Sequence, residues 1–414
     1  MQCGRDKNSC YICVNYLQNR IYCTLGMDLY LFNPETDLAL ASHGANYTAS
    51  EKIRQMAHDL AVLPLWYAPQ GSGIWVPDEE SAHFVEKLCS QLGTLFFTVR
   101  KKNVHSEEIK KVQPWGWDNA VRNRLLRMGI SAEILPSDLQ LDEHRWLSSR
   151  ERVADMLSHF KDEPYCHGNA ANLYTLEDCE RYALAAKEGV VFKSPWSSSG
   201  KGLSWCRDGF TDRHRNWCQR VLKEQGVVTA QSIKQRVCDF AMEFHCDEEK
   251  RWSFIGYSLF QTNAQGAYLG NLLLSDEEIE QRLSAYVPLQ HLLRVREILL
   301  HQLEPFDYQG YMGIDMMICA ESNDAFSIHP CVEMNWRMNM GVVSHLLREK
   351  VLHPEAHATF HVDNYPHREA FETQFLPRLE EYPCQWEGQR LMKGLFPLTP
   401  ITPQTLSVAY ISAT

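Results

Sequence analysis

Two polar segments, far apart in the chain, carry residue types that could hold a phosphorylated ligand. The first, GVVFKSPWSSSGKGL, runs from Gly189 to Leu203; an apolar, strand-like run ends near Lys193 and is followed by serines and glycines. Small residues let backbone N–H groups approach an anion, hydroxyls add donors, and lysines supply positive charge. A flexible linker is the alternative for this loop taken alone. It is not a P-loop, because Pro195 stands where that motif requires its first glycine.

The second segment, GYMGIDMMICAESNDAFSIHPCVEMNWRMNMG, places acidic and amide side chains on two strand-like runs. Asp315 follows the start of the first run. Glu333 and Asn335 lie two residues apart on the second, so they share one face of a strand. Oxygen ligands from two adjacent strands suit Mg²⁺, which binds a few protein oxygens together with nucleotide phosphates. Arg337, two residues further, is expected on the same face, where its planar fork suits a phosphoryl or acyl-phosphate oxygen.

The alternative for this second segment is a solvated hairpin with incidental charges. Its flanking residues are apolar, as in a central sheet, and buried polar groups without partners are costly. A bound metal or ligand therefore explains the polar set more simply.

Composition restricts the class of protein. The chain has 414 residues, 44% hydrophobic and 22% charged, which is typical of a folded protein with two or three lobes. A net charge of -11 and the lack of any Lys/Arg run argue against a general nucleic-acid binder. No apolar run approaches the roughly 20 residues of a membrane helix. Fourteen scattered cysteines and no apolar signal segment indicate free thiols, and we expect a cytoplasmic protein.

Residues 1–26 differ from the rest of the chain and contain four cysteines: Cys3, Cys10, Cys13 and Cys23. Only Cys10 and Cys13 have a close, zinc-like spacing, and no second such pair follows. We interpret the segment as a loose N-terminal extension, with a zinc site as the alternative.

Residues 27–146 are predicted to form an N-terminal α/β domain. A strand, DLYLF, is followed by the turn-rich NPETD; helical patterns over Ser50–Leu63 and Glu79–Leu92 alternate with the strand-like LPLWYA and FFTV. This alternation predicts a mostly parallel sheet with helices on both faces. From residue 147 onward, β-rich segments such as CDFAMEFHC and RWSFIGYSLFQT predict an α+β region with antiparallel strands.

Substrate residues are harder to identify. Three groups could line a cleft that faces the nucleotide: Asn33, Glu35 and Asp37; Trp115 and Trp117; and Asn263, Tyr268 and Asn271. The respective alternatives are turn capping, packing of aromatic rings and an exposed hairpin.

In this order, the two polar segments resemble the ATP-grasp superfamily of carboxylate-amine and carboxylate-thiol ligases, over Leu147–His345. The resemblance implies an ATP-grasp fold: an N-terminal α/β domain, a central nucleotide-covering lobe over 147–235 and a C-terminal mixed-sheet lobe over 236–414 that carries the metal site. It implies that Lys193 contacts the α- and β-phosphates. A loop would close over the β- and γ-phosphates with Ser197, Ser198, Ser199, Gly200, Lys201 and Gly202.

The resemblance also assigns the remaining ligands. Asp315, Glu333 and Asn335 would hold one or two Mg²⁺ ions, with Mn²⁺ as an alternative ion. Arg150 falls where many members place another phosphate-contacting cation. In the hinge that cradles adenine and ribose, Gln231 stands where members usually have an acidic residue, and Asp239 matches the acidic position used for the ribose hydroxyls.

The implied activity is that of an ATP-dependent, ADP-forming ligase. A small-molecule carboxylate would be activated as an acyl phosphate and attacked by an amine or thiol acceptor, with Lys193 and Arg337 in catalytic roles and self-association as a homo-oligomer left open. One alternative is a catalytically degenerate ATP-grasp nucleotide-binding protein with a regulatory or assembly role. Another is a metal-binding interaction protein built around the N-terminal cysteines.

Overall fold

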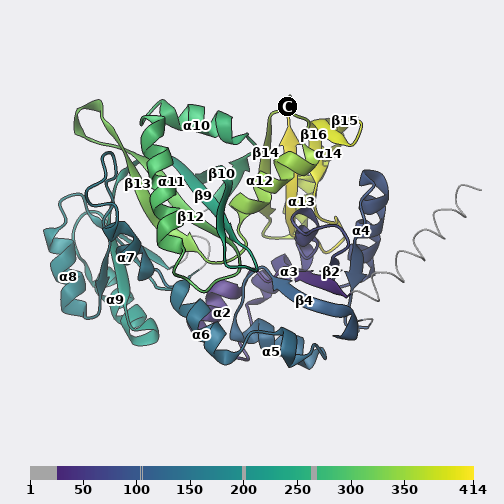
Figure 1. Ribbon diagram of the computed structural model, residues 1–414, viewed down its shortest axis with the longest axis horizontal. Helices are drawn as coiled ribbons and strands as arrows, with labels where there is room; N and C mark the ends of the chain where they lie inside the picture. Colours follow the sequence, from purple (N-terminus) through teal and green to yellow (C-terminus); the bar gives the residue numbers. More distant parts are fainter. Residues whose placement is uncertain (1–25, 103, 105, 198–201, 263–267) are drawn as a thin grey trace, which may run out of the picture.

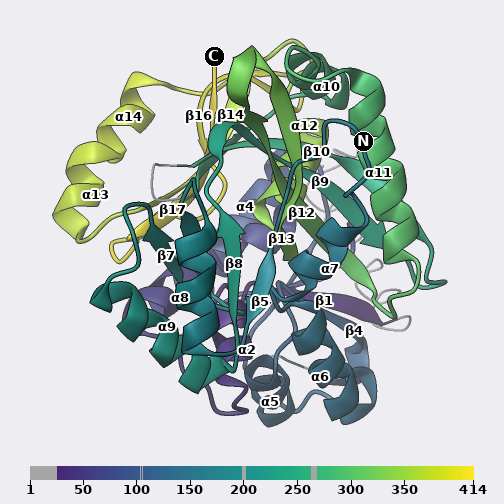
Figure 2. The same ribbon diagram turned by 90° about the vertical axis from the view of Figure 1, so that its left-hand side faces the viewer.

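A computed structural model describes residues 26–102, 104, 106–197, 202–262 and 268–414. Several predictions lie outside the described residues: the roles of Cys3, Cys10, Cys13, Cys23, Ser198, Ser199, Gly200, Lys201 and Asn263. The described part contains three β-sheets with helices packed against them (Figures 1 and 2). Figure 1 shows α8 and α9 at one end of the molecule and α4 near the other.

The first sheet is parallel and has the strand order β3-β2-β1-β4. Its strands are β1 (Met27–Leu31), β2 (Gly73–Trp75), β3 (Phe97–Val99) and β4 (Ile109–Pro114). Its main helices are α2 (Thr36–Ser42), α3 (Glu51–Asp59), α4 (Glu79–Leu92), α5 (Asn119–Arg127) and α6 (Asp138–Leu147). The predicted parallel sheet and the helix over Glu79–Leu92 are confirmed, and the Asp78 side chain caps that helix by accepting from the Ser81 N–H.

One predicted strand in this domain is wrong. The segment LPLWYA forms a buried 3₁₀ helix, η1 (Leu63–Trp66), in which the Pro64 carbonyl accepts from the N–H groups of Tyr67 and Ala68. Proline fixes a φ angle that suits a helical turn, and a short apolar run does not by itself distinguish a strand from a buried helical turn. The Trp66 indole N–H donates to the Leu398 carbonyl at 2.8 Å.

The central lobe contains the second sheet, which is antiparallel with the order β5-β8-β6-β7. Its strands are β5 (Ala171–Leu173), β6 (Val190–Lys193), β7 (Leu203–Cys206) and β8 (Val228–Ser232). Its helices are α8 (Leu176–Ala185) and α9 (Asp212–Gln225), and α7 (Arg152–Ser158) precedes them. Every residue of β6 is buried, as the apolar run VVF predicts, so Lys193 enters a covered position at the end of the strand.

The third sheet has nine strands in the order β13-β12-β9-β10-β11-β14-β17-β16-β15, all paired antiparallel. Its first five strands in the chain are β9 (Gln235–Cys246), β10 (Trp252–Thr262), β11 (Tyr268–Leu272), β12 (Gly310–Ala320) and β13 (Phe326–Asn335). The last four are β14 (Ala358–Asn364), β15 (Gln385–Glu387), β16 (Arg390–Pro397) and β17 (Ser407–Ala413). Its helices are α10 (Asp276–Ser284), α11 (Leu289–Leu303), α12 (Met340–Val351), α13 (Arg368–Gln374) and α14 (Leu376–Glu381).

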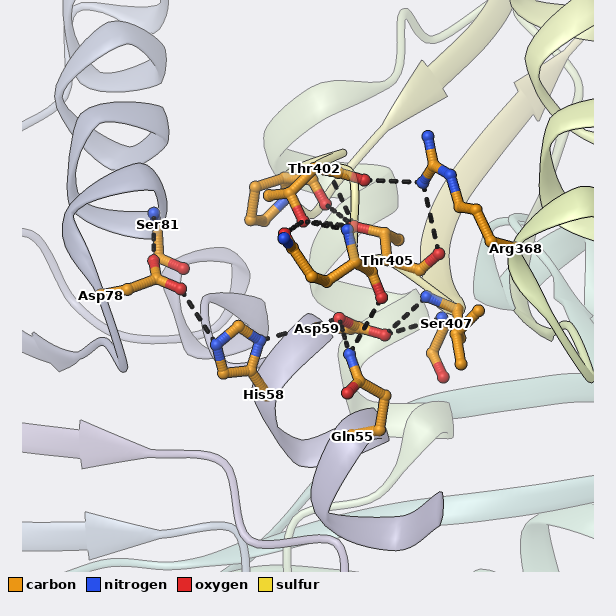
Figure 3. A network of polar contacts seen from close by, with 12 residues as sticks. Gln55, His58, Asp59, Asp78, Ser81, Arg368, Thr402, Thr405 and Ser407 are labelled. Carbon is orange, nitrogen blue, oxygen red and sulfur yellow. Dashed lines mark hydrogen bonds and ion pairs between the residues drawn. The ribbon is translucent and has the colours of Figure 1, made fainter. Parts of the chain in front are cut away.

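A buried carboxylate connects the first domain to the last strand. Asp59, at the end of α3, accepts from the backbone N–H groups of Leu406 and Ser407 at 2.8 and 2.9 Å, and from the Gln55 amide at 2.9 Å (Figure 3). These bonds fix the start of β17 against the N-terminal domain.

The hydrophobic core also crosses from the first domain to the third sheet. One cluster joins Ile74, Val76 and Trp66 to Phe360 and Ile411. Residues 27–146 therefore bury one of their apolar faces against the C-terminal part of the chain. Within the described ranges, no helix is long and apolar enough to span a membrane.

Candidate active site

The two polar segments meet at one cavity of about 420 Å³ between the second and third sheets. Lys193, at the end of β6, and Glu333, near the end of β13, both line this cavity. Two regions far apart in the sequence therefore face a common space that both cations and carboxylates line. The predicted site residues in its lining are Arg150, Lys193, Gln231, Asp239, Asp315 and Glu333.

Lys193 is buried and donates from Nζ to the Val332 carbonyl at 3.1 Å. Burial lowers the pKa of this ammonium group to about 8, although the nearby Glu333 carboxylate opposes the shift. The group is therefore mostly protonated at neutral pH. A phosphate in the cavity would add negative charge and so favour the ammonium form further.

Arg150 connects the start of the predicted phosphate loop to the opposite wall. Its Nη1 donates to the Ser194 carbonyl at 2.8 Å and to the Ser197 hydroxyl at 2.6 Å, and its Nη2 forms an ion pair with Glu333 at 2.6 Å. The guanidinium is buried. A cation in this position can neutralise a phosphate while it contacts Glu333.

The two described ends of the loop lie close together. The Ser194 N–H donates to the Gly202 carbonyl at 2.9 Å, and Gly202 has a φ of +75°. A Cβ at this position would overlap Ser194 and Ser197. Glycine is therefore required at position 202 for both its backbone conformation and its close packing.

Gln231 and Asp239 lie at the hinge side of the cavity. Gln231 in β8 is 2% exposed, and its Nε2 has no hydrogen-bond partner among the residues that the structure describes. An unsatisfied buried donor indicates a ligand acceptor at this position. The Asp239 carboxylate accepts from Thr262 at 2.6 Å and from Arg236 at 2.9 Å, and burial raises its pKa.

Asp315 and Glu333 are directly opposite each other on the neighbouring strands β12 and β13, and Asn335 pairs with Gly313. The pKa of Asp315 is raised to about 8, chiefly by burial and also by the charges of Glu333 and Glu243, which outweigh a hydrogen bond to Asn335 that lowers it. A cation between the facing carboxylates would relieve this repulsion. Two carboxylates and an amide oxygen fit Mg²⁺ when nucleotide oxygens complete the coordination.

Arg337 lies beyond the end of β13, which stops at Asn335. Its Nε and Nη2 donate to the two oxygens of Asp37 at 2.9 and 2.8 Å, and its Nη1 donates to the Met338 carbonyl. Its predicted contact with a phosphoryl oxygen remains a prediction, since its fork is held by a carboxylate of the N-terminal domain. Arg337 does line a neighbouring cavity of about 180 Å³.

A second cavity, of about 180 Å³, shares Arg150, Asp315 and Glu333 with the first. Asn335, Tyr268 and Asn271 also line it, as do residues that the sequence analysis did not identify, chiefly Glu243, Ser258 and Asn339. Burial raises the pKa of Glu243 to about 7. An acidic residue in the apolar run FAMEF is the sequence signal that could have identified it.

A third cavity, of about 330 Å³, lies between the N-terminal domain and the third sheet. Trp115 and Trp117 line it, together with Tyr30, Tyr67 and Tyr311. The other residues that were predicted near a substrate have internal partners. Asn33 donates to the Gly116 carbonyl at 2.8 Å, Glu35 pairs with Arg124 at 3.5 Å, and Asp37 pairs with Arg337.

No family model matches the sequence, and no curated protein matches it. Solved structures match over most of the chain. Biotin carboxylase from Campylobacter jejuni, in complex with an ATP analogue, is 12% identical with a TM-score of 0.50, covering 94% of this chain and 87% of that chain. The chain has the ATP-grasp fold.

Two further structures show a similar arrangement. N5-carboxyaminoimidazole synthetase from Staphylococcus aureus, complexed with ADP, is 10% identical with a TM-score of 0.48, covering 94% of this chain and 93% of that chain. Carboxyaminoimidazole ribonucleotide synthase from Aspergillus clavatus, complexed with ATP, is 9% identical with a TM-score of 0.49, covering 94% of each chain. The match to the biotin carboxylase structure confirms the ATP-grasp fold predicted from the two polar segments.

Proposed function

We propose that this protein is an ATP-dependent ligase that activates a substrate carboxylate as an acyl phosphate and transfers the acyl group to an amine or thiol. The observation that carries the proposal is the one cavity that Lys193 and Arg150 share with Asp315 and Glu333, so that cations and oxygen ligands line the same space. The bound nucleotides named for the structures of similar fold agree with it.

In the first step, a carboxylate oxygen of the substrate attacks the γ-phosphorus of ATP, and the bond to the β–γ bridging oxygen breaks. ADP leaves with that oxygen. Lys193 and Arg150 would neutralise charge on the phosphate oxygens, and positioning with charge neutralisation dominates phosphoryl transfer. Asp315, Glu333 and Asn335 would hold Mg²⁺, which supplies Lewis-acid stabilisation of the triphosphate.

In the second step, the amine or thiol attacks the acyl carbon, inorganic phosphate leaves, and the nucleophile loses a proton. Lys193, Arg150 and Glu243 are buried at the two cavities, which would limit the access of water to the reacting groups. Exclusion of water protects an acyl phosphate from hydrolysis. Gln231 and Asp239 would position the base and the ribose.

The test measures ADP release with Mg²⁺, ATP and a panel of carboxylates and acceptors. We expect the double variant Glu333→Ala/Asn335→Ala to keep its fold by circular dichroism and to lose ADP release. The matched control is Gln290→Ala/Glu297→Ala, two exposed positions in α11. ATP turnover that persists in the folded Glu333/Asn335 variant would contradict the proposed metal face.

A further inference from the structure

The cavity of about 180 Å³ contains a carboxylate that the phosphate and metal chemistry leaves unused. Glu243, in β9, is 1% exposed; its Oε1 accepts from the Ser258 hydroxyl and its Oε2 from the Asn339 amide, both at 2.9 Å. Both donors are neutral. No ion pair within the described ranges includes Glu243, so its charge lacks a cationic partner.

A shared metal ion does not account for this carboxylate. The described part of the chain contains no group of three or more His, Cys, Asp or Glu residues placed to hold one metal ion. Among the described residues, Glu243, Asp315 and Glu333 are thus not grouped around one metal position. Because a buried charge is costly unless it is paired, the fitting partner is a second cation supplied by a ligand.

The surrounding backbone is shaped around this carboxylate. Gly313 in β12 and Gly341 in the first turn of α12 face it from two sides, and a Cβ at either position would overlap the Glu243 oxygens. Asn339 both caps α12, by accepting from the Val342 N–H at 3.0 Å, and donates to Glu243. Neighbouring elements thus hold the carboxylate in one position at the cavity wall.

Another part of the same wall requires an anion or a carbonyl oxygen. Asn271 in β11 is 1% exposed and lines the cavity; its Oδ1 accepts from the Tyr268 hydroxyl, whereas its Nδ2 has no acceptor among the described residues. Met340 and Gly341, at the N-terminus of the twelve-residue helix α12, line the cavity as well. The positive end of a helix favours a carboxylate.

We propose that this cavity binds a small zwitterion, a free amino acid, with its ammonium group at Glu243 and its carboxylate toward Asn271 and the N-terminus of α12. About 180 Å³ is below the roughly 300–1,000 Å³ of pockets for drug-sized ligands, which suits a molecule of this size. This inference rests on the proposed function in one respect: the bound amino acid would be a substrate of the ligase. Asp315 and Glu333, which line the same cavity, would place it beside the reacting phosphate.

The first test is binding by calorimetry, with Mg²⁺ and a non-hydrolysable ATP analogue present. The probes are the twenty proteinogenic amino acids, each compared with its matched 2-hydroxy acid and its decarboxylated amine. We expect at least one amino acid to bind about tenfold or more tightly than both of its analogues. The hydroxy acid lacks the charge for Glu243, and the amine lacks the group for Asn271.

Two isosteric variants separate the two contacts. Glu243→Gln should reduce the preference for the amino acid over its hydroxy acid, and Asn271→Asp should reduce the preference over the amine, each about tenfold. A general structural defect would weaken all three ligands together. The control is Glu249→Gln, at an exposed position after β9, and Kd for the ATP analogue should stay within about threefold in every variant.

The outcomes distinguish the two proposals. Failure of the wild-type protein to bind the ATP analogue contradicts the proposed function. Binding of the analogue without binding of any amino acid, or with equal binding of the hydroxy acid and the amine, overturns this inference and leaves the nucleotide site intact. Amino-acid binding that is unchanged in Asn271→Asp also overturns it, whether or not Glu243→Gln folds.

Discussion

Asp37 and Arg337, which are 300 positions apart in the chain, form a two-point ion pair with distances of 2.8 and 2.9 Å. Their side chains are only 17% and 18% exposed. The pair joins α2 of the N-terminal domain to the segment that follows β13, next to the proposed metal face. It therefore couples the position of the N-terminal domain to the geometry of the site.

Removal of Asp37 should destabilise the protein, because the largely covered Arg337 guanidinium loses the carboxylate that it contacts at two points. We expect Asp37→Ala to lower the free energy of unfolding by about 3–5 kcal/mol, measured by urea denaturation. The control is Asp138→Ala. The Asp138 side chain is 83% exposed and pairs with Arg122, so its removal should change the free energy of unfolding by about 0–1 kcal/mol. Equal effects of the two variants would contradict the structural role of the Asp37 pair.

The affinity for ATP should fall as the pH rises through the pKa of Lys193, about 8. The ammonium form binds phosphate, and deprotonation removes that charge, so Kd should increase about tenfold between pH 7 and pH 9. Lys193→Arg should flatten this dependence, because a guanidinium stays protonated. Lys187→Met, at an exposed position of the same lobe, should retain the wild-type pH profile. A flat wild-type profile would argue against a phosphate contact at Lys193.

Ionisation of Asp315 should destabilise the ligand-free protein. Its folded-state pKa of about 8 lies above the ordinary value of 3.8, so stability should decline as the pH rises from 3.8 toward 8. We expect Asp315→Asn to have a higher Tm than the wild-type protein at pH 8, with a smaller difference at pH 5. Mg²⁺ with an ATP analogue should raise Tm in the wild type but not in the variant. A variant that responds to the ligands like the wild type would contradict metal binding by Asp315.

The Asp59 carboxylate should determine how firmly β17 is held. Asp59→Ala leaves the Leu406 and Ser407 N–H groups without their acceptor, and each unsatisfied buried group costs about 1–3 kcal/mol. Hydrogen exchange of the β17 amides should therefore be faster than in the wild type. Glu51→Ala, at an exposed position in the first turn of the same helix, is the control. Unchanged exchange in β17 would show that the strand is held by its neighbours alone.

The positions of Lys193, Glu333 and Asn335 on their strands were predictable, because local sequence patterns determine them. An apolar run that ends in Lys193, and the two-residue alternation of Glu333 and Asn335, fix strand faces without knowledge of distant contacts. The alternation does not extend to Arg337, because β13 ends at Asn335, but Arg337 still lines one cavity with Glu333 and Asn335. Its ion pair with Asp37 comes from another domain. No local rule predicts a contact across 300 positions.

Glu243 was missed for a related reason. A single acid in an apolar strand can be either buried or exposed, and here its environment comes from Ser258, Asn339 and Gly341 on other elements. The 3₁₀ helix at Leu63–Trp66 shows the same limit, since tertiary packing rather than periodicity distinguishes it from a strand. Sheet faces and motif residues could be predicted, whereas partners across domains could not.

A crystal structure with a non-hydrolysable ATP analogue and Mg²⁺ would test the shared nucleotide site of Lys193 and Glu333 most directly. We expect one triphosphate between the Lys193 ammonium group and the Glu333 carboxylate, with the metal ion bound by oxygens of Asp315, Glu333 and Asn335. A nucleotide bound elsewhere, or one that contacts neither Lys193 nor the Glu333 face, would contradict it.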